Sequence, residues 1–486
     1  MSRYQDLADQ TEKLIAAGVL RAGERLPSVR ETCRRHRISP STVTQAYYLL
    51  EGKGLIEARP KSGYFVRARL GRSLAEPEMT RPVGGSTELQ VSDFIFEILD
   101  SVRDPSVVPL GSSFLSPDLL PLDKLGRFLA AAARKLDPLA TVTDLPPGND
   151  ELRRQLALRY LARSAMVSPQ EIVITSGAME ALNLCLQAVT RAGDLIAIES
   201  PTFYAGLQAS ERLGLKVIEI PSHPRDGVSL AALEDALRHH PVKACLFMLN
   251  FANPTGSLLA DERKKALLQL LYRYDVPLIE DDVYAELYFG REAPLCTKAE
   301  DPAGLVMHVS SFSKCLAPGY RLGWVAAGRY ANRIQRLKLS TSLATTVPVQ
   351  IAVAEYLKQG AYDNHLRQLR RKLAELEAGF VDAVERHFPP GTRLARPQGG
   401  YFLWVELPPR VDTLALHRRA LDKGISIAPG PIFSAKREFG HHLRLNFGHP
   451  DTDRQRAAIA LLGQMLAAQG GGGAGRPLPM SGPYAG

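Results

Sequence analysis

Residues 310–324 read SSFSKCLAPGYRLGW and place a single lysine, Lys314, among small, hydroxylated and apolar residues. Arg321 follows seven positions later, beyond a Pro-Gly pair. A charged amine in such a run costs stability when it is buried, unless it has a partner or a chemical role. The stretch therefore predicts a site that uses one amine, nearby hydroxyl groups and an arginine.

Around this stretch, from about residue 93 to residue 468, short apolar runs alternate with helical patterns. EIVIT at 171–175 precedes the helical pattern AMEALNLCLQAV, and LIAIE at 195–199 precedes a second one. Near-continuous apolar strands separated by helices predict an α/β domain with a mostly parallel sheet covered on both faces. Functional residues of such folds gather at the carboxyl ends of the strands.

Chemically distinctive residues stand directly after several of these predicted strands. Gly177, Ala178 and Met179 open a helix, where unpaired N–H groups and the helix dipole favour a phosphate. The further candidates are, in chain order, Phe203, Tyr204, Asn253, Asp281, Tyr284, Ser311, Ser313, Lys314 and Arg321.

Taken together, these residue types have one coherent use. A lysine forms a Schiff base with a carbonyl group, and a carboxylate keeps a pyridine nitrogen protonated. Hydroxyl and amide groups can hold a phenolate, and an arginine with a helix N-terminus binds a phosphate. Pyridoxal 5′-phosphate carries all four groups, so the set predicts this cofactor with a Schiff base on Lys314. Each residue alone has an ordinary alternative: Asp281 could cap a helix, Asn253 form a turn, and Lys314 lie on the surface.

The first seventy residues form a separate basic segment, with 13 lysines and arginines against 7 acidic residues. After a first helical pattern, Ser28 and Ser39 are N-cap candidates for two further helices. The inner face of the last helix would consist of Val43, Ala46, Tyr47 and Leu50. A hairpin with a basic tip at 60–63 follows, so the segment predicts a helix-turn-helix with a wing that binds DNA. A small helical protein-docking domain is the alternative.

Residues 4–67 resemble the winged-helix DNA-binding domain of GntR-type bacterial regulators in GERLPSVRE, SPSTVTQAYYLLEGKGLI and SGYFV. This resemblance implies that the second helix of the helix-turn-helix and the wing contact double-stranded operator DNA. The implied DNA-binding residues are Arg30, Ser41, Thr42, Thr44, Gln45, Lys61 and Gly63.

From Asp93 to about residue 468 the chain resembles fold-type I pyridoxal-phosphate enzymes of the aspartate aminotransferase class. The matching stretches are NPTG at 253–256, EDDVY at 280–284, SFSK with PGYRLGW, and LRLNFG at 443–448. The resemblance implies a mixed, mostly parallel sheet with helices on both faces and a smaller C-terminal α+β subdomain.

The same resemblance implies roles for single residues. Lys314 would bind the cofactor covalently, Asp281 would face the pyridine nitrogen, and Asn253 with Tyr284 would hold the phenolic oxygen. The implied phosphate ligands are Gly177, Ala178, Met179, Ser311, Ser313 and Arg321.

Three positions of the resemblance concern the ring and the substrate. Phe203 would stack on the cofactor ring, with Tyr204 as its competitor, and Arg444 would clamp the carboxylate of a substrate or effector. Thr141 and Thr143 stand near the place where the class often has a tyrosine that reaches into the partner's site.

A winged helix fused to such a domain resembles the MocR-type branch of GntR regulators. The expected domains are a winged helix at 1–68, a linker at 69–92, an aminotransferase-like domain at 93–468 and a disordered tail at 469–486. The expected protein is a cytoplasmic homodimer without a membrane segment, whose DNA binding responds to a small amine, an amino acid or pyridoxal phosphate itself. The alternatives are an active aminotransferase with a DNA-binding domain, and a DNA-binding protein whose large domain only dimerises.

Metal binding and disulfides are not expected. The five cysteines are scattered without a Cys-x-x-Cys pair, which predicts a reducing compartment. The paired histidines at 239–240 and 441–442 lack ligand spacing to other candidates and are expected on the surface.

Overall fold

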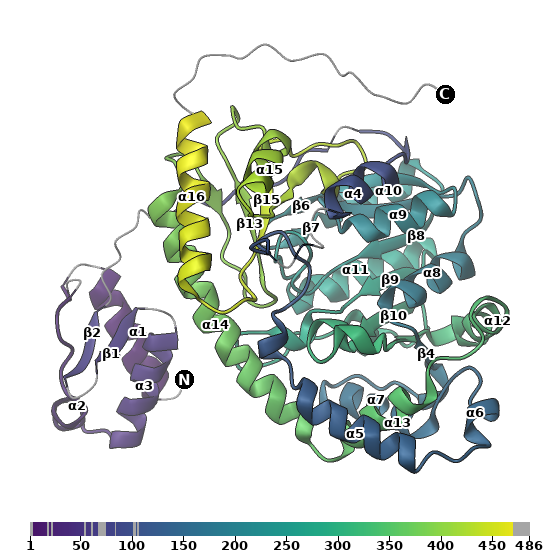
Figure 1. Ribbon diagram of the computed structural model, residues 1–486, viewed down its shortest axis with the longest axis horizontal. Coiled ribbons are helices and arrows are strands. Elements are labelled where there is room, and N and C mark those ends of the chain that lie inside the picture. The colour runs from purple at the N-terminus through teal and green to yellow at the C-terminus, as the bar shows by residue number, and fades with distance from the viewer. Residues whose placement is uncertain are drawn as a thin grey trace.

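The computed structural model describes residues 3–16, 19–20, 23–52, 55–59, 62–66, 74–82, 84–100, 104 and 106–469. A small N-terminal unit lies beside a large α/β body, next to the long helix α14 (Ala361–His387) (Figure 1). None of the helices in the described ranges is both long enough and apolar enough to cross a membrane.

The N-terminal unit is a three-helix bundle with a hairpin. It contains α1 (Arg3–Ala16), α2 (Val29–His36), α3 (Pro40–Gly52), β1 (Ile56–Arg59) and β2 (Gly63–Val66). Ser28 caps α2 by accepting a hydrogen bond from the Glu31 N–H, at 3.2 Å. The four residues predicted for the inner face of α3 are buried: Val43, Ala46, Tyr47 and Leu50. β1 and β2 pair antiparallel, so the predicted helix-turn-helix with a wing is confirmed.

The large domain is built on one mixed sheet, with the strand order β3-β6-β5-β8-β9-β10-β11-β4 and β7 paired to β6. Strands β6, β5, β8, β9 and β10 are parallel, whereas β11 runs antiparallel to both of its neighbours. The strands are β3 (Thr87–Glu88), β4 (Ile172–Thr175), β5 (Leu195–Ser200), β6 (Lys216–His223), β7 (Gly227–Val228), β8 (Val242–Phe247), β9 (Leu278–Asp281), β10 (Val306–Ser311) and β11 (Gly323–Ala326).

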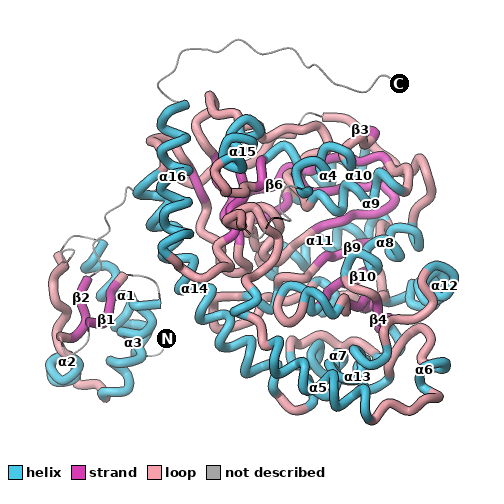
Figure 2. Tube along the Cα trace, viewed as in Figure 1, coloured by secondary structure: helices cyan, strands magenta, loops and turns pink. Residues whose placement is uncertain are grey.

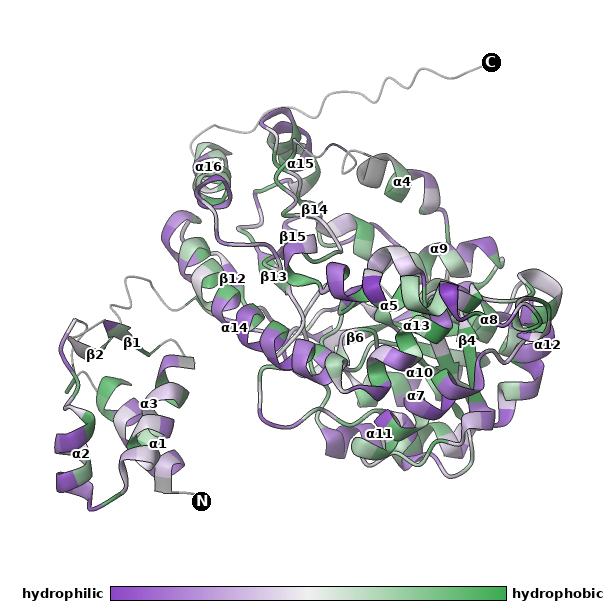
Figure 3. Cartoon of the chain, turned by 60° about the horizontal axis from the view of Figure 1, so that its bottom comes forward, coloured by the Kyte–Doolittle hydropathy of each residue, from purple (hydrophilic) through white to green (hydrophobic). Residues whose placement is uncertain are grey.

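Helices cover both faces of this sheet because successive residues of its strands point to opposite sides. In β5, Ile196 and Ile198 join one apolar cluster with α8 and α9, and Leu195 and Ala197 join another with α10 and α11. Figure 2 shows the strands enclosed by helices, and Figure 3 shows hydrophobic residues gathered inside the large domain. The helices are α4 (Ser92–Asp100), α5 (Leu122–Arg134), α6 (Ala140–Thr143), α7 (Asp150–Ala162), α8 (Ala178–Val189), α9 (Tyr204–Arg212), α10 (Leu230–His239), α11 (Asp261–Tyr274), α12 (Ala331–Thr341) and α13 (Val347–Lys358).

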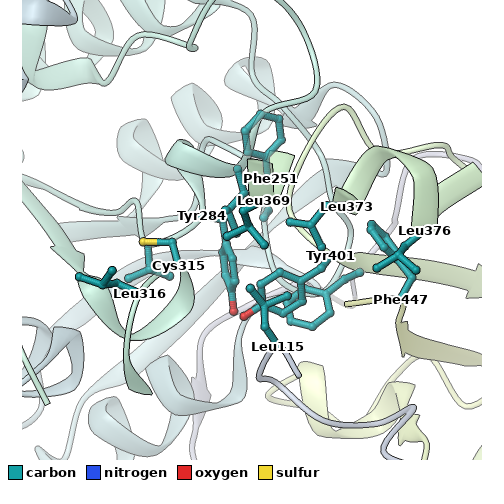
Figure 4. Close-up of a cluster of buried hydrophobic side chains, with 14 of the residues drawn as sticks. Leu115, Phe251, Tyr284, Cys315, Leu316, Leu369, Leu373, Leu376, Tyr401 and Phe447 are labelled. Atoms are coloured by element: carbon teal, nitrogen blue, oxygen red, sulfur yellow. The ribbon is translucent and has the colours of Figure 1, made fainter. Parts of the chain in front are cut away.

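A smaller sheet near the C-terminus forms the expected α+β subdomain. Its strands are β12 (Arg393–Leu394), β13 (Phe402–Glu406), β14 (Ala428–Pro429) and β15 (His442–Asn446), all antiparallel in the order β12-β13-β15-β14. Helices α15 (Thr413–Asp422) and α16 (Asp453–Gln469) accompany it. Figure 4 shows the apolar cluster where α14 meets both sheets, with Tyr284, Leu369, Leu373 and Tyr401 side by side.

Much of the segment expected to be a linker lies along the large domain. Thr80 donates its hydroxyl to the Ser200 carbonyl at 2.7 Å and pairs with Ser222 through both backbone and side chain. β3 then adds a strand to the edge of the main sheet beside β6. Residues 74–82 and 84–91 of the predicted linker therefore lie along the large domain, a position that the sequence pattern left open. Residues 67–73 and 470–486 lie outside the described residues.

Candidate functional site

Lys314 ends the short 3-10 helix η6 (Phe312–Lys314), which follows β10 directly. Its Nζ donates a hydrogen bond to the Ser113 carbonyl at 2.9 Å and lies 4.3 Å from the centroid of the Phe114 ring. Burial lowers the pKa of Lys314 to about 7; Arg444 lowers it further, and Asp281 opposes the shift. The lowered pKa favours the uncharged amine, which is the nucleophilic form.

Asp281 ends β9, the strand that neighbours β10 in the sheet. Its side chain is buried, and Oδ1 has no hydrogen-bond partner among the described residues. Burial raises the pKa of Asp281 to about 7, with a further contribution from the neighbouring Asp282. A carboxylate oxygen without a partner, inside a site that also holds a lysine, fits a protonated ring nitrogen.

Asn253, Tyr284 and Arg444 form a connected group on the same side of the site. The Asn253 amide donates to the Tyr284 hydroxyl at 3.3 Å, and Arg444 Nη1 donates to Asn253 Oδ1 at 2.9 Å. Arg444 Nη2 donates to the Gly111 carbonyl at 2.6 Å, whereas its Nε is buried without a partner among the described residues. The structure thus brings together the three residues that the sequence assigned to a phenolate and a carboxylate.

The predicted phosphate ligands meet where β4 and β10 end. Arg321 Nη1 donates to Ser313 Oγ and Nη2 to the Ser176 carbonyl, both at 3.4 Å. Gly177 precedes α8 with a φ of +94°, and a Cβ at this residue would lie 2.6 Å from Arg321 Nη2. The backbone conformation therefore favours glycine here, and a Cβ would displace the guanidinium of Arg321. Ser311 is buried and caps η6, and Ala178 and Met179 form the first turn of α8.

Phe203 and Tyr204 lie at the start of α9 with their ring centroids 4.6 Å apart. Tyr204 is buried, and its hydroxyl lies 3.2 Å from Ser113 Oγ, whereas Phe203 is half-buried. Phe203 therefore stays the predicted stacking ring, with Tyr204 as its competitor.

The segment 111–114 was missed by the sequence reasoning, although it forms one wall of the site. The Ser113 carbonyl accepts hydrogen bonds from both Lys314 and the Tyr401 hydroxyl, and Phe114 exposes 44% of its surface beside the lysine. No strand or helix pattern marks this segment, since it is a loop whose role depends on packing against β15.

In the N-terminal unit, the predicted DNA-contacting residues lie on α2, α3 and the wing. Four of them, Arg30, Ser41, Gln45 and Gly63, are exposed. Thr42 and Thr44 are half-buried, and Thr42 Oγ1 lies 2.7 Å from Ser39 Oγ. Lys61 lies outside the described residues. Arg25 was missed: it is exposed and bridges to Phe65, so that its guanidinium lies beside Gly63 of the wing.

Within the part of the chain that the structure describes, two groups of side chains have the donor atoms of a metal site. The first group contains Glu280, Asp282 and His308. His308 is hydrogen-bonded to Asp282 and to Tyr160, and Glu280 accepts a hydrogen bond from the Thr297 hydroxyl. The second group contains Glu406, His441 and His442, with donor atoms within 4.8 Å of one another and with Arg393 3.8 Å from the Glu406 carboxylate.

The surface position expected for the 441–442 pair is wrong for His442. Strand pairing of β13 with β15 stacks the His442 ring on Trp404, with the centroids 5.3 Å apart, and buries its Nδ1.

Comparisons with known proteins agree with this division of the chain. Residues 127–461 match the family "Aminotransferase class I and II", and residues 3–66 match "Bacterial regulatory proteins, gntR family". The first match spans more than half of the chain, so the chain belongs to the class I and II aminotransferase family. With its GntR domain, it has the architecture of the MocR-type transcriptional regulators.

Individual relatives match either nearly the whole chain or about four fifths of it. Two Escherichia coli (strain K12) proteins named as HTH-type transcriptional regulators, YdcR and YjiR, are 46% and 38% identical over 96% of this chain and 99% of theirs. The solved α-aminoadipate aminotransferase LysN of Thermus thermophilus, in complex with N-(5′-phosphopyridoxyl)-L-leucine, is 29% identical. It matches 79% of this chain and 96% of its own with a TM-score of 0.70. The fold and these neighbours imply dependence on pyridoxal phosphate.

The close approach of Gly177 to Arg321 leads to a first prediction. Gly177→Ala should weaken the affinity for pyridoxal phosphate about ten- to hundredfold, because the added Cβ displaces the guanidinium and one charged hydrogen bond is worth roughly 1.5–3 kcal/mol. The affinity is measured by titrating the cofactor into the protein and following its visible absorption. Gly319→Ala is the matched control, since a Cβ there meets no atom within 4 Å. Equal affinities for the two variants would contradict the assigned phosphate position.

Proposed function

We propose that this regulator binds pyridoxal phosphate on Lys314 and that the cofactor, alone or joined to an amine, changes its affinity for operator DNA. The single observation that carries the proposal is the half-buried Lys314 amine, which is hydrogen-bonded to the Ser113 carbonyl and lies in a domain fused to a winged helix. A lysine with a pKa near 7 is unusual for a structural residue but suits one that binds an aldehyde.

The residues around Lys314 fit the cofactor group by group. Arg321, Ser313 and the N-terminus of α8 would hold the phosphate, since charged donors and helix N-termini favour anions. Asp281 would pair with the ring nitrogen through its free Oδ1, and Asn253 with Tyr284 would face the phenolic oxygen. When bound, the cofactor supplies an aldehyde, which can bond either to the Lys314 amine or to the amine of a ligand.

The effector we propose is an amine with a carboxylate, which an amino acid provides. Arg444 is fully buried, and in this structure its donors go to Asn253 and to main-chain carbonyls of the 111–112 segment. A carboxylate would be a better acceptor than a neutral carbonyl, because charge-assisted hydrogen bonds are stronger. Such a ligand would therefore compete with Gly111 and Ser112 and shift the 111–114 wall of the site.

The DNA-binding role rests on the N-terminal unit. Its exposed α2, α3 and wing residues, with Arg25 added, form the proposed contact to operator DNA. We further propose that the protein acts as a homodimer in the cytoplasm, which would bring two winged helices to two half-sites. A turnover-competent aminotransferase is the second candidate, because Lys314, Asp281 and Arg444 together also suit transamination.

The central experiment compares wild type with Lys314→Ala. The wild type should show a visible absorption band with pyridoxal phosphate, and its DNA affinity should change about five- to 150-fold, the usual range of coupling between two sites. Lys314→Ala should lose both the band and the change, while still binding DNA. Operator fragments from the region upstream of the gene serve for the affinity measurement. Steady release of keto acid with DNA binding indifferent to the amine would favour the aminotransferase instead.

The pH dependence of cofactor capture gives a third prediction. Only the uncharged amine attacks the aldehyde, so the capture rate should rise from pH 5.5 and level off above about pH 8, since the pKa of Lys314 is about 7. An ordinary lysine, with a pKa near 10.4, would still gain rate at pH 10. The growth of the visible band is followed after mixing, with N-acetyl-lysine in the same buffers as the reference for the cofactor's own titration. A rate that keeps rising tenfold per pH unit beyond pH 8 would show that the pKa of Lys314 is not lowered.

Replacing Arg444 tests the carboxylate contact. Arg444→Gln should respond to pyridoxal phosphate and to amines without a carboxylate, but at least tenfold more amino acid should be needed for the same change in DNA affinity. Arg444→Lys keeps the charge and loses the bidentate geometry. The amount of amino acid that it needs should therefore lie between those of the wild type and Arg444→Gln. The visible band reports that the site is intact in each variant. If Arg444→Gln responds to amino acids like the wild type, the clamp is assigned to the wrong residue.

A further inference from the structure

Four charged side chains form a connected group at the edge of the large domain, here called the charged cluster: Arg159, Glu286, Asp363 and Arg370. Arg159 binds Glu286 at 2.6 Å and Asp363 at 2.8 Å. Arg370 binds the other Glu286 oxygen at 3.1 Å and donates Nε to the Glu286 carbonyl at 2.6 Å. Arg159, Glu286 and Arg370 expose only about a fifth of their side chains, so their charges depend on one another.

This cluster faces the DNA-binding unit across a cleft of about 2180 Å³. The wall on the side of the DNA-binding unit consists of Tyr48, Leu49, Glu51, Ile56 and Glu57, from α3 and β1. The opposite wall includes the charged cluster and further arginines of α14. Among the described residues, the Arg291 guanidinium contacts the DNA-binding unit directly, 4.4 Å from the centroid of the Tyr4 ring. Figure 1 shows the N-terminal unit beside α14 at this place.

The cluster is also joined to the cofactor lysine. Cys315 follows Lys314 in the chain, and its Sγ lies 2.9 Å from the Tyr362 hydroxyl. The Arg159 guanidinium lies over the Tyr362 ring, 4.4 Å from its centroid. Figure 4 shows Cys315 and Leu316 close to Tyr284 and to leucines of α14. Three consecutive contacts thus lead from Lys314 to the wall that faces the DNA-binding unit.

A second connection reaches the cluster from the other side of the site. Glu286 lies in the 3-10 helix η4 (Ala285–Leu287), two residues after Tyr284. Tyr284 is buried and hydrogen-bonded to Asn253. A movement of Tyr284 would therefore displace Glu286 through the short backbone segment between them. This connection does not involve Cys315 or Tyr362.

We propose that the charged cluster is the surface through which the state of the Lys314 site reaches the DNA-binding unit, with the acidic edge of α3 and β1 as its partner. The proposal rests on the proposed function, because it needs a ligand at Lys314 that affects DNA binding. Occupation of the site fixes Lys314 and Tyr284, and both are tied to the cluster. Arg159 is shared between two carboxylates, so a small shift changes the charge that the cluster presents to the opposite wall. On that wall Glu57 is paired with Arg59 at 2.8 Å and Glu51 accepts the Ala58 N–H at 2.9 Å, so the cluster would act on these pairs. A ligand can bias DNA binding in this way only through such a difference between the two states.

The test removes a single hydroxyl. Tyr362→Phe should keep the visible band of bound pyridoxal phosphate and the DNA affinity without cofactor, because neither site is touched. The change in DNA affinity on adding the cofactor should fall several-fold, because the connection through Tyr284 and Glu286 remains. Tyr356→Phe is the matched control, since Tyr356 belongs to the same apolar cluster but packs against Phe128, and it should keep the wild-type change.

Glu286→Gln provides an independent variant at the other connection. It should also keep the visible band and reduce the cofactor-dependent change in DNA affinity several-fold, and the double variant should lose it. A wild-type-sized change in both Tyr362→Phe and Glu286→Gln would overturn the proposal and leave cofactor sensing intact. An equal loss in Tyr356→Phe would assign the effect to a general loosening of the core and would also overturn it. If the wild type itself shows no change, cofactor sensing fails and this proposal fails with it.

Discussion

The site depends on an imbalance of charge in a buried place. Lys314, Arg321 and Arg444 bring three cationic groups to the ends of the strands, and the charge of Asp281 favours the protonated form of Lys314. Burial and the two arginines push the lysine towards its neutral form. The same arrangement supports the proposal that a phosphate binds at Arg321 and a carboxylate at Arg444. Burial has the largest part in lowering the pKa of Lys314, and the two arginines that would bind these anions lower it further.

The fold supplies this arrangement from distant parts of the chain. Asp281 and Lys314 come from neighbouring parallel strands, whose carboxyl ends lie together at the edge of the sheet. Arg444 comes from the small C-terminal sheet and reaches Asn253 and the 111–112 segment. A movement of the small sheet relative to the large one would therefore alter the carboxylate position directly. This geometry supports the proposal that the large domain serves as a receptor for small molecules.

The DNA-binding unit is tied to this receptor in two ways. Residues 74–82 and 84–91 lie along the large domain, with Thr80 hydrogen-bonded between β5 and β6. The charged cluster around Glu286 faces α3 and β1 across the cleft. Since α3 also carries Thr42 and Gln45, its two sides would serve different purposes, one towards DNA and the other towards the receptor. Tyr48, exposed on α3 and lining the cleft, belongs to the second side.

The sequence by itself determined the two domains, the alternation of strands and helices and most of the residues around Lys314. These follow from local rules: apolar periodicity marks the strands, and residues after parallel strands share one edge of the sheet. The tertiary structure decided what those rules do not reach. The loop carbonyl of Ser113 that accepts the Lys314 amine, the stacking of His442 on Trp404 and the contact of Arg159 with Tyr362 all join segments far apart in the chain. Such contacts depend on how finished elements pack, because side-chain partners across a fold leave no periodic pattern in the sequence.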